Sequence, residues 1–211
     1  MTELGFDCVG ARVDPYAAAP GLVLTLRITS DTRVDAIALR CQLRIEPHRR
    51  RYTPAEAERL ADLFGDVSRW GETLKPLQLA NVSVMVPGFS SLCDVDLDVP
   101  CGYDLEVASG AYFAGLEEGE VPLLLLFSGS VFAVDDGRMQ VTQVPWSKEV
   151  SFRLPVATWR QMVDTHFPNS GWIRCGRETI DALRRFKSTR ALPTWDATLL
   201  ALLDSVEERM P

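Results

Sequence analysis

Apolar and polar residues alternate with a period of two through much of the first 154 residues. The clearest case is 21–29, where leucine or isoleucine stands at every second position, as in a strand with one buried face. Residues 34–45 repeat the pattern. The short polar turn Ser30-Asp31-Thr32 between these two strands predicts a hairpin. Further strands are predicted at 4–13, 77–86, 92–99, 103–107, 139–144 and 149–154.

The most apolar run in the chain is 121–134, with the sequence VPLLLLFSGSVFAV. Pro122 disfavours a helix interior but fits the start of a strand. The turn signal Asp135-Asp136-Gly137 ends the run. We therefore predict a central strand that is covered on both faces over its first half. Gly129 in its middle indicates a bulge or a close approach of two backbones.

Helical spacing replaces the alternation in three places. Near 54–64, Thr53, Pro54 and Glu56 form the capping-box pattern of a helix start, and Gly65 provides an end. A short helix is predicted at 108–116. After residue 154 the period stays helical, which predicts about three helices. The last helix has an apolar stripe formed by Trp195, Leu199, Leu202, Leu203 and Val206.

Strands come first and helices last, which is typical of a mainly β protein of the α+β class. We predict an antiparallel β-sandwich-like core over 1–153, with one inserted helix near 54–64. A helical layer over 154–211 is expected to pack on this core. The whole chain of 211 residues is then a single domain.

Composition narrows the class of protein. Hydrophobic residues make up 46% of the chain, as in ordinary folded domains, and the net charge of −7 disfavours binding to nucleic acid. The N-terminal residues lack a signal-peptide pattern, and the run 121–134 is shorter than the roughly 20 residues that a spanning helix needs. The five cysteines are scattered and odd in number. We expect a cytoplasmic protein with reduced thiols and no membrane insertion.

Charge is segregated along the sequence. Residues 91–120 contain eight acidic residues and no lysine or arginine, whereas 169–190 contain six basic and two acidic residues. Asp94, Asp96 and Asp98 alternate with apolar residues, which indicates the acidic face of a strand and not a calcium loop. Such a face can discourage edge pairing. Together with the basic segment, it can instead steer a charged partner.

Basic and aromatic residues are the predicted contacts to a partner. The run Arg49-Arg50-Arg51 can bind carboxylates or phosphates, and an exposed aromatic residue in the last third would act as a hot spot. The predicted partner-binding residues are Arg49, Arg50, Arg51, Trp172, Arg177, Arg184 and Arg185. The alternatives are a solvated basic loop and aromatic residues that belong to the core.

The sequence predicts no catalytic residue, no metal site and no cofactor. Ser128-Gly129-Ser130 lacks the second glycine and the following helix of a nucleophile elbow. His48 and His166 have no ligand partner at helical spacing, and no Cys-x-x-Cys is present. A serine or a Cys–His pair that only the fold brings together stays open as an alternative.

Several short runs resemble an uncharacterised bacterial protein family of similar length, and they extend over nearly the whole chain. They are Arg44-Ile-Glu-Pro47, Arg49-Arg-Arg-Tyr-Thr-Pro54, Leu63-Phe-Gly65, Ser68-Arg-Trp-Gly71, Met85-Val-Pro-Gly-Phe89, Pro122-Leu-Leu-Leu-Leu-Phe-Ser-Gly129, Pro145-Trp146, Phe167-Pro-Asn-Ser-Gly-Trp172 and Ala191-Leu-Pro-Thr-Trp195. Members of that family are often encoded near uptake [NiFe]-hydrogenase genes. The resemblance implies an accessory or assembly role and no particular chemistry.

These observations favour a non-enzymatic protein-binding factor, accessory or chaperone-like, with a hydrogenase component as the implied partner. A β-sandwich that binds a small ligand between its sheets is the first alternative. An enzyme with a serine or Cys–His site assembled by the fold is the second.

Overall fold

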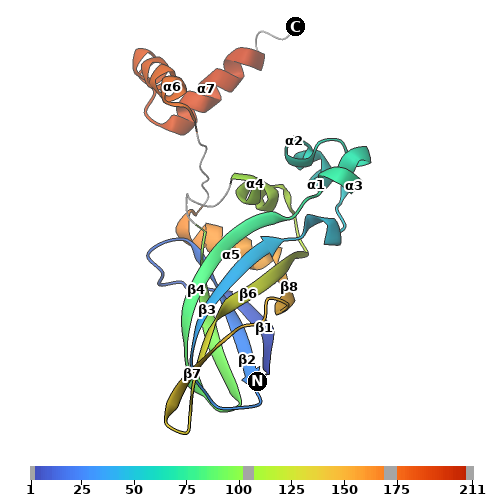
Figure 1. Ribbon diagram of the computed structural model, residues 1–211. Coiled ribbons are helices and arrows are strands. Elements are labelled where there is room, and N and C mark those ends of the chain that lie inside the picture. The colour runs from blue at the N-terminus through green and yellow to red at the C-terminus, as the bar shows by residue number, and fades with distance from the viewer. Residues whose placement is uncertain (1–2, 102–106, 169–174, 208–211) are drawn as a thin grey trace. The chain divides into compact units, whose positions relative to one another are not determined.

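The computed structural model describes residues 3–101, 107–168 and 175–207 (Figure 1). The chain divides into two compact units, Met1–Asn169 and Ser170–Pro211, and each is described by itself. The strand predicted at 103–107 falls almost wholly outside the described residues, because only Val107 is described and it begins a helix. Trp172 lies outside them as well.

Two antiparallel sheets form the first unit (Figure 1). The smaller has the order β1-β2-β5. Its strands are β1 (Leu4–Val13), β2 (Gly21–Ser30) and β5 (Leu92–Pro100). The larger has the order β4-β3-β6-β7, and β8 also pairs with β6. Its strands are β3 (Val34–Ile45), β4 (Leu77–Phe89), β6 (Glu120–Asp135), β7 (Arg138–Gln143) and β8 (Glu149–Pro155). The mainly β, α+β prediction is confirmed.

The hairpin predicted from 21–29 and 34–45 is wrong. β2 pairs with β1 and β5, whereas β3 pairs with β4 and β6, so the turn at residues 31–33 carries the chain from one sheet to the other. The alternation correctly identified the buried face of each strand. It could not show that the two faces oppose each other across the sandwich, because a period of two specifies a face and not a neighbour.

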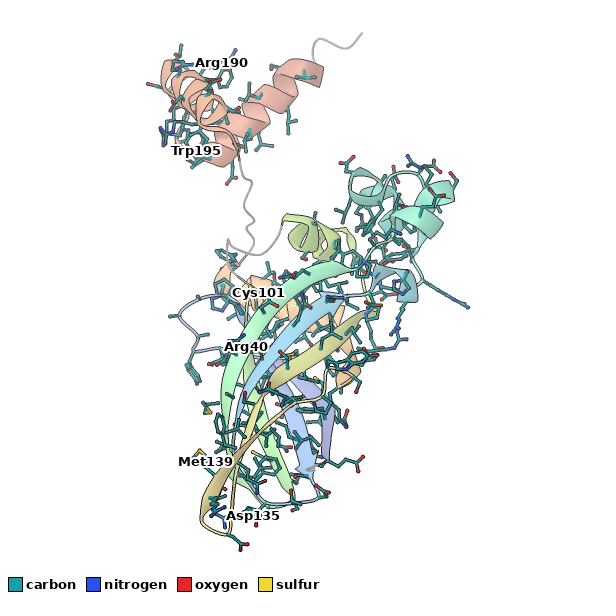
Figure 2. The ribbon with its side chains drawn as sticks, in the orientation of Figure 1. Arg40, Cys101, Asp135, Met139, Arg190 and Trp195 are labelled. Atoms are coloured by element: carbon teal, nitrogen blue, oxygen red, sulfur yellow. The ribbon has the colours of Figure 1, made fainter. Side chains whose placement is uncertain are left out.

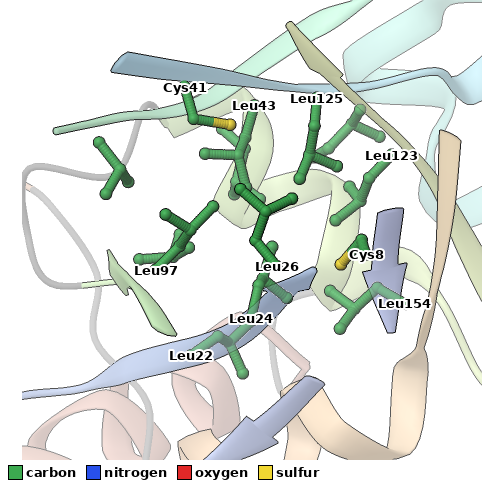
Figure 3. Packing of buried hydrophobic residues seen from close by; sticks show 14 of the residues in the cluster. Cys8, Leu22, Leu24, Leu26, Cys41, Leu43, Leu97, Leu123, Leu125 and Leu154 are labelled. Atoms are coloured by element: carbon green, nitrogen blue, oxygen red, sulfur yellow. The ribbon is translucent and has the colours of Figure 1, made fainter. Parts of the chain in front are cut away.

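Side chains from both sheets fill the space between them. Leu22, Leu24 and Leu26 of β2 lie opposite Leu43 of β3 and Leu125 of β6, and all five are buried (Figure 3). β4 lies beside β5 and β1 beside β8, so the two sheets also approach each other at their sides. The interior is therefore packed with aliphatic residues, as expected for a sandwich core.

β6 is the central strand that its sequence predicted. It pairs with β3 along one edge and with β8 and then β7 along the other. Its inward row is buried, but Leu124 and Leu126 on the outer face are only half-buried, so the covering of the second face is partial. At Gly129 the φ angle is +149°, and a Cβ atom would lie 2.1 Å from the Ala38 carbonyl oxygen. The predicted close backbone approach is confirmed.

Short helices follow β3 and precede β6. The first group consists of η1 (Pro47–Arg49), α1 (Pro54–Arg59), α2 (Ala61–Phe64), η2 (Val67–Arg69) and α3 (Trp70–Thr73), and α4 (Val107–Gly115) follows β5. The capping box of Thr53 and Glu56 is present at the start of α1. The single helix predicted near 54–64 is divided at Leu60, which is fully buried.

α5 (Val156–His166) packs against the sandwich, where it contacts β1, β2 and β8. Trp159 of α5 stacks on Phe113 of α4, with the ring centroids 3.9 Å apart. The first of the predicted C-terminal helices therefore covers the core. The second unit contains α6 (Arg177–Thr189) and α7 (Trp195–Glu207), which contact each other. That these two helices pack on the core stays a prediction.

Candidate functional site

Arg50 is held inside the protein. Its side chain is 8% exposed, and its Nη2 lies 2.8 Å from Oε1 of Glu56, whose side chain is 2% exposed. Arg50 also donates hydrogen bonds to the backbone carbonyls of Glu118 and Glu120. Burial would raise the pKa of Glu56, but hydrogen bonds from Arg50 and from two backbone N–H groups outweigh it and keep this pKa below its usual value. This pair fastens the start of α1 to the segment before β6.

Arg49 and Arg51 differ from Arg50. Arg49 lies 3.4 Å from the buried carboxylate of Glu46, which also faces His48 at 3.4 Å. Arg51 is exposed and has no ion pair among the described residues. Of the three predicted basic contacts in this loop, Arg51 has the side chain most available to a partner.

A hollow of about 760 Å³ lies beside Arg51. Tyr52 and Trp70 form part of its wall, and their rings meet edge to face at 5.1 Å. The hydroxyl of Tyr52 donates to the Pro47 carbonyl at 2.8 Å and lies 2.9 Å from the hydroxyl of Tyr112, which fixes the ring. The hollow therefore belongs to the helical insertion and not to the space between the sheets.

The acidic face of β5 is a ladder of ion pairs. Arg27 on β2 donates two hydrogen bonds of 2.8 Å to Asp94, and Arg12 on β1 donates two, of 3.1 and 2.8 Å, to Asp96. These bonds hold the pKa of both carboxyls below the usual range. Asp98 alone of the three has no ion pair among the described residues. The sequence could not reveal this arrangement, because the arginines are 67 and 84 residues away from their partners.

Among the described residues, none of the hydrogen bonds found for the serine and cysteine candidates goes to a histidine. Ser128 is exposed on the outer face of β6, and Ser130 accepts a hydrogen bond of 3.2 Å from the Gln143 amide. Burial raises the pKa of Cys8 to about 11 and those of Cys41 and Cys101 to about 12, which opposes thiolate formation.

Within 3–101, 107–168 and 175–207, no three His, Cys, Asp or Glu side chains are grouped so that they could hold a metal ion.

The outer face of the larger sheet has a polar half and an apolar half. Around Arg40, side chains bond to each other: Arg44 donates to Gln42 at 2.8 Å, and Gln42 donates to Gln78 at 3.3 Å. Toward the β6–β7 hairpin, the same face becomes apolar; Figure 2 shows Met139 there and Arg40 farther along the sheet. We call this apolar area the sheet patch, and it consists of Ala36, Ala38, Met85, Pro87, Phe132, Val134, Met139 and Val141.

Strand register makes the sheet patch continuous. Ala36 stands between Pro87 and Phe132, and Phe132 is in turn opposite Val141. Met85 is 64% exposed and Met139 69%. This surface was not predicted, since the alternation in 139–144 indicated a strand but could not show that Met139 and Val141 lie on the outer face of the sheet, away from the second sheet. Contiguous exposed apolar groups on a folded protein mark an interaction surface.

β7 ends the row of strands in this sheet. Its only strand partner among the described residues is β6, and every residue from Arg138 to Gln143 is exposed. The turn before it has positive φ angles at Asp136 and Gly137, as a tight hairpin requires. Just beyond β7, Trp146 is 92% exposed. The free backbone edge of β7 thus lies beside the sheet patch.

The second unit carries the other predicted contacts. Arg177, Arg184 and Arg185 are exposed on α6, and Arg184 lies 3.3 Å from Asp181. On α7, the predicted apolar stripe is largely exposed, from Trp195 near its start, labelled in Figure 2, to Val206 near its end. No helix of the described ranges is long and apolar enough to cross a membrane.

A family model described as a family of unknown function (DUF6084) matches residues 1–211. The chain belongs to this family. A comparison with curated proteins finds no match. Among solved structures, the beta-glucosidase of Kluyveromyces marxianus is similar at a TM-score of 0.28 and 9% identity, over 72% of this chain and 15% of that one. Its complex with glucose gives a TM-score of 0.25 and 11% identity over the same shares. Similarity at this level carries no argument about this DUF6084 protein.

Proposed function

We propose that this DUF6084 protein is a non-enzymatic protein-binding factor, and that its main contact surface is the sheet patch with the free edge of β7. The observation that carries the proposal is the position of Met139 and Val141, which are exposed on β7 and lie beside Val134 and the half-buried Phe132 of β6 on the outer face of the sheet. Large apolar side chains in such an arrangement gain free energy when a partner removes them from water.

The chemistry of the surface suits a polypeptide partner. An edge strand offers backbone N–H and C=O groups, to which an extended segment can add as a further strand. Met85 and Met139 are flexible and can adapt to varied apolar side chains. The expected partner segment is therefore extended, with an apolar residue at every second position that stands beside Met139 and Val141 and extends the sheet patch.

A hydrogenase component is the specific partner that the family resemblance favours. In this proposal the protein acts as an accessory or chaperone-like factor that holds an extended segment of a [NiFe]-hydrogenase subunit. The basic residues Arg51 and Arg177 are exposed and would contribute contacts to carboxylates of such a partner, whereas Arg184 and Arg185, which are also exposed, are assigned to a different contact below.

Site-specific photo-crosslinking in native cells tests the surface. A photoreactive residue at 139 or 141 should crosslink to another protein, whereas one at 140, on the opposite face of the same strand, should do so much less. Mass spectrometry of the crosslinked product then tests the hydrogenase component. Equal crosslinking at 139 and 140, or none at either position, would reject the sheet patch; a different partner protein would reject only the hydrogenase role.

A matched pair of variants tests the same surface with purified partner. Met139→Glu with Val141→Glu places two charges on the sheet patch and should weaken binding by on the order of a hundredfold. Gln140→Glu with Thr142→Glu places two charges on the other face of β7 and should change binding little. Because all four positions are exposed, both variants should fold.

The hollow beside Arg51 supports a second candidate function, the binding of a small ligand with an anionic group and an apolar part. Its aromatic wall of Tyr52 and Trp70 and the free charge of Arg51 are the favourable features. Native mass spectrometry of protein purified from its own cells should then show a bound mass that Trp70→Ala abolishes. Protein that carries no bound mass would count against this candidate.

A further inference from the structure

The helix pair α6–α7 has more apolar surface than it can bury by itself. On one side of α7, Thr198 is fully buried and Ala201 and Leu202 are half-buried. On the other side, five larger side chains are exposed, including Leu200 at 58% and Leu203 at 61%. We call this exposed side the outer face of α7, and it consists of Trp195, Leu199, Leu200, Leu203 and Val206.

Helical spacing makes the outer face continuous. Its residues are separated by four, one, three and three positions, which places them on neighbouring turns of one side of the helix. A face of this width is characteristic of a helix with packed neighbours on two sides. Within its own unit, α7 has α6 as its helical neighbour.

The size of the unit points to a further partner. Ser170–Pro211 is a short compact unit, and units of about 40 residues need disulfides, metals or oligomerisation to be stable. Cys175 is a free thiol. The described residues hold no group of side chains fit for a metal. Of disulfides, metals and oligomerisation, only oligomerisation has a matching feature in the described part of this unit, which is the outer face of α7.

The charges on the two helices are of opposite sign. α6 has four basic and two acidic residues, whereas α7 has three acidic residues and no basic one. On α7, Asp196 and Asp204 stand one turn before and one turn after Leu200, and both are exposed. The bases of one copy and the acids of another are thus complementary, as a two-fold contact between identical chains requires.

We propose that the outer face of α7 is covered by the same face of a second copy of this chain. The α6–α7 pairs of two copies then form a four-helix arrangement, in which α7 packs on α7. Asp196 and Asp204 of each copy face Arg184 and Arg185 on α6 of the other. The chain is a homodimer through its second unit, and the sheet patch of each copy stays free for the proposed protein partner.

Sedimentation velocity of the full-length chain over a range of concentrations tests the dimer. The wild type should show a monomer–dimer equilibrium, and Leu199→Glu with Leu203→Glu should raise its Kd by on the order of a hundredfold. Met139→Glu is the matched control, since it adds a charge to an exposed apolar position of the first unit. It should leave the Kd unchanged while it weakens partner binding, so the failure of the dimer and that of the proposed function are distinguishable.

Charge reversal provides a test that leaves the apolar face intact. Asp196→Lys with Asp204→Lys, and separately Arg184→Glu with Arg185→Glu, should each raise the dimer Kd by roughly tenfold. All four changes in one chain should restore it, and added salt should reduce these differences. A wild type that stays monomeric at every concentration would overturn the proposal. A dimer that is indifferent to Leu199→Glu with Leu203→Glu, in protein whose circular dichroism retains its helix content, would overturn it as well.

Discussion

The first unit and the helix pair α6–α7 contain similar leucine-rich segments with opposite surroundings. In β6, Leu123 and Leu125 are buried between two sheets. In α7, Leu199, Leu200 and Leu203 are exposed. β6 has hydrogen-bonded strands along both edges and a second sheet across its inner face, whereas α7 packs on one helix of its own unit. The number of packed neighbours, and not the apolar content of the segment, decides how much of it is buried.

The contrast has a functional meaning. A buried row stabilises the fold that contains it, whereas an exposed row contributes only when another surface covers it. The buried rows of the sandwich therefore stabilise the first unit, and the outer face of α7 and the sheet patch are the surfaces that we propose for partners.

Replacing one leucine in each region tests the contrast directly. Leu125→Asp places a carboxylate in the core beside Leu43 and should cost more than about 4 kcal/mol of unfolding free energy, which is most of the stability of a marginally stable domain. Leu200→Asp changes an exposed position and should alter the unfolding free energy of the first unit by less than about 0.5 kcal/mol. Urea unfolding followed by tryptophan fluorescence measures both. A soluble, cooperatively melting Leu125→Asp protein would show that the core is placed wrongly.

Two ion pairs of the first unit allow a buried contact to be compared with an exposed one. Arg50→Met leaves the buried carboxylate of Glu56 without its charge partner and should destabilise the fold by about 3–5 kcal/mol. Arg27→Met breaks a solvent-exposed pair with Asp94 and should cost only about 0–1 kcal/mol. The midpoints of urea unfolding for the two variants compare the costs. Equal losses would mean that Arg50 is not held in the interior as described.

The close contact of β6 with β3 makes a backbone prediction. Gly129→Ala would bring a Cβ atom against the Ala38 carbonyl in a backbone conformation that alanine rarely adopts, and should cost about 2–3 kcal/mol. Gly10→Ala is the control in β1, where no atom lies within 4 Å of the added methyl group. It should change the melting temperature little. A Gly129→Ala protein as stable as the wild type would contradict the close packing of the two strands.

Acid should weaken the first unit through Glu56, Asp94 and Asp96, whose pKa values are held low in the folded protein. A carboxyl with a lowered folded pKa contributes stability above its unfolded pKa, near 4, and this stability is lost as pH falls through the folded pKa. The urea midpoint should therefore fall below about pH 4.5. Glu56→Gln should flatten this dependence while lowering the midpoint at neutral pH. An unchanged slope in Glu56→Gln would contradict the role of this carboxyl.

The candidate surfaces were only partly predictable. Arg51, Arg184 and Arg185 are exposed, as basic loop and helix residues usually are. Arg50 stands next to Arg51 in the sequence, yet it is buried against Glu56, since the helical insertion and the segment before β6 close around it. The ion pairs of Asp94 and Asp96 on β5 and the sheet patch both depend on which strands become neighbours. Local patterns contain no information on that choice.

The sequence alone determined the local features of this protein: which face of β2, β3 and β5 is buried, the capping box at Thr53, the turn at Asp136-Gly137 and the central position of β6. These features depend on residues close together in the chain, whose periodicity and turn chemistry act over a few positions. Only the tertiary structure decided that β2 and β3 belong to different sheets, that Asp94 and Asp96 are paired, and that Met139 and Val141 are exposed on one face of β7. The physical reason is that hydrophobic burial is non-directional, so a sequence can specify what must be covered while long-range packing specifies what covers it.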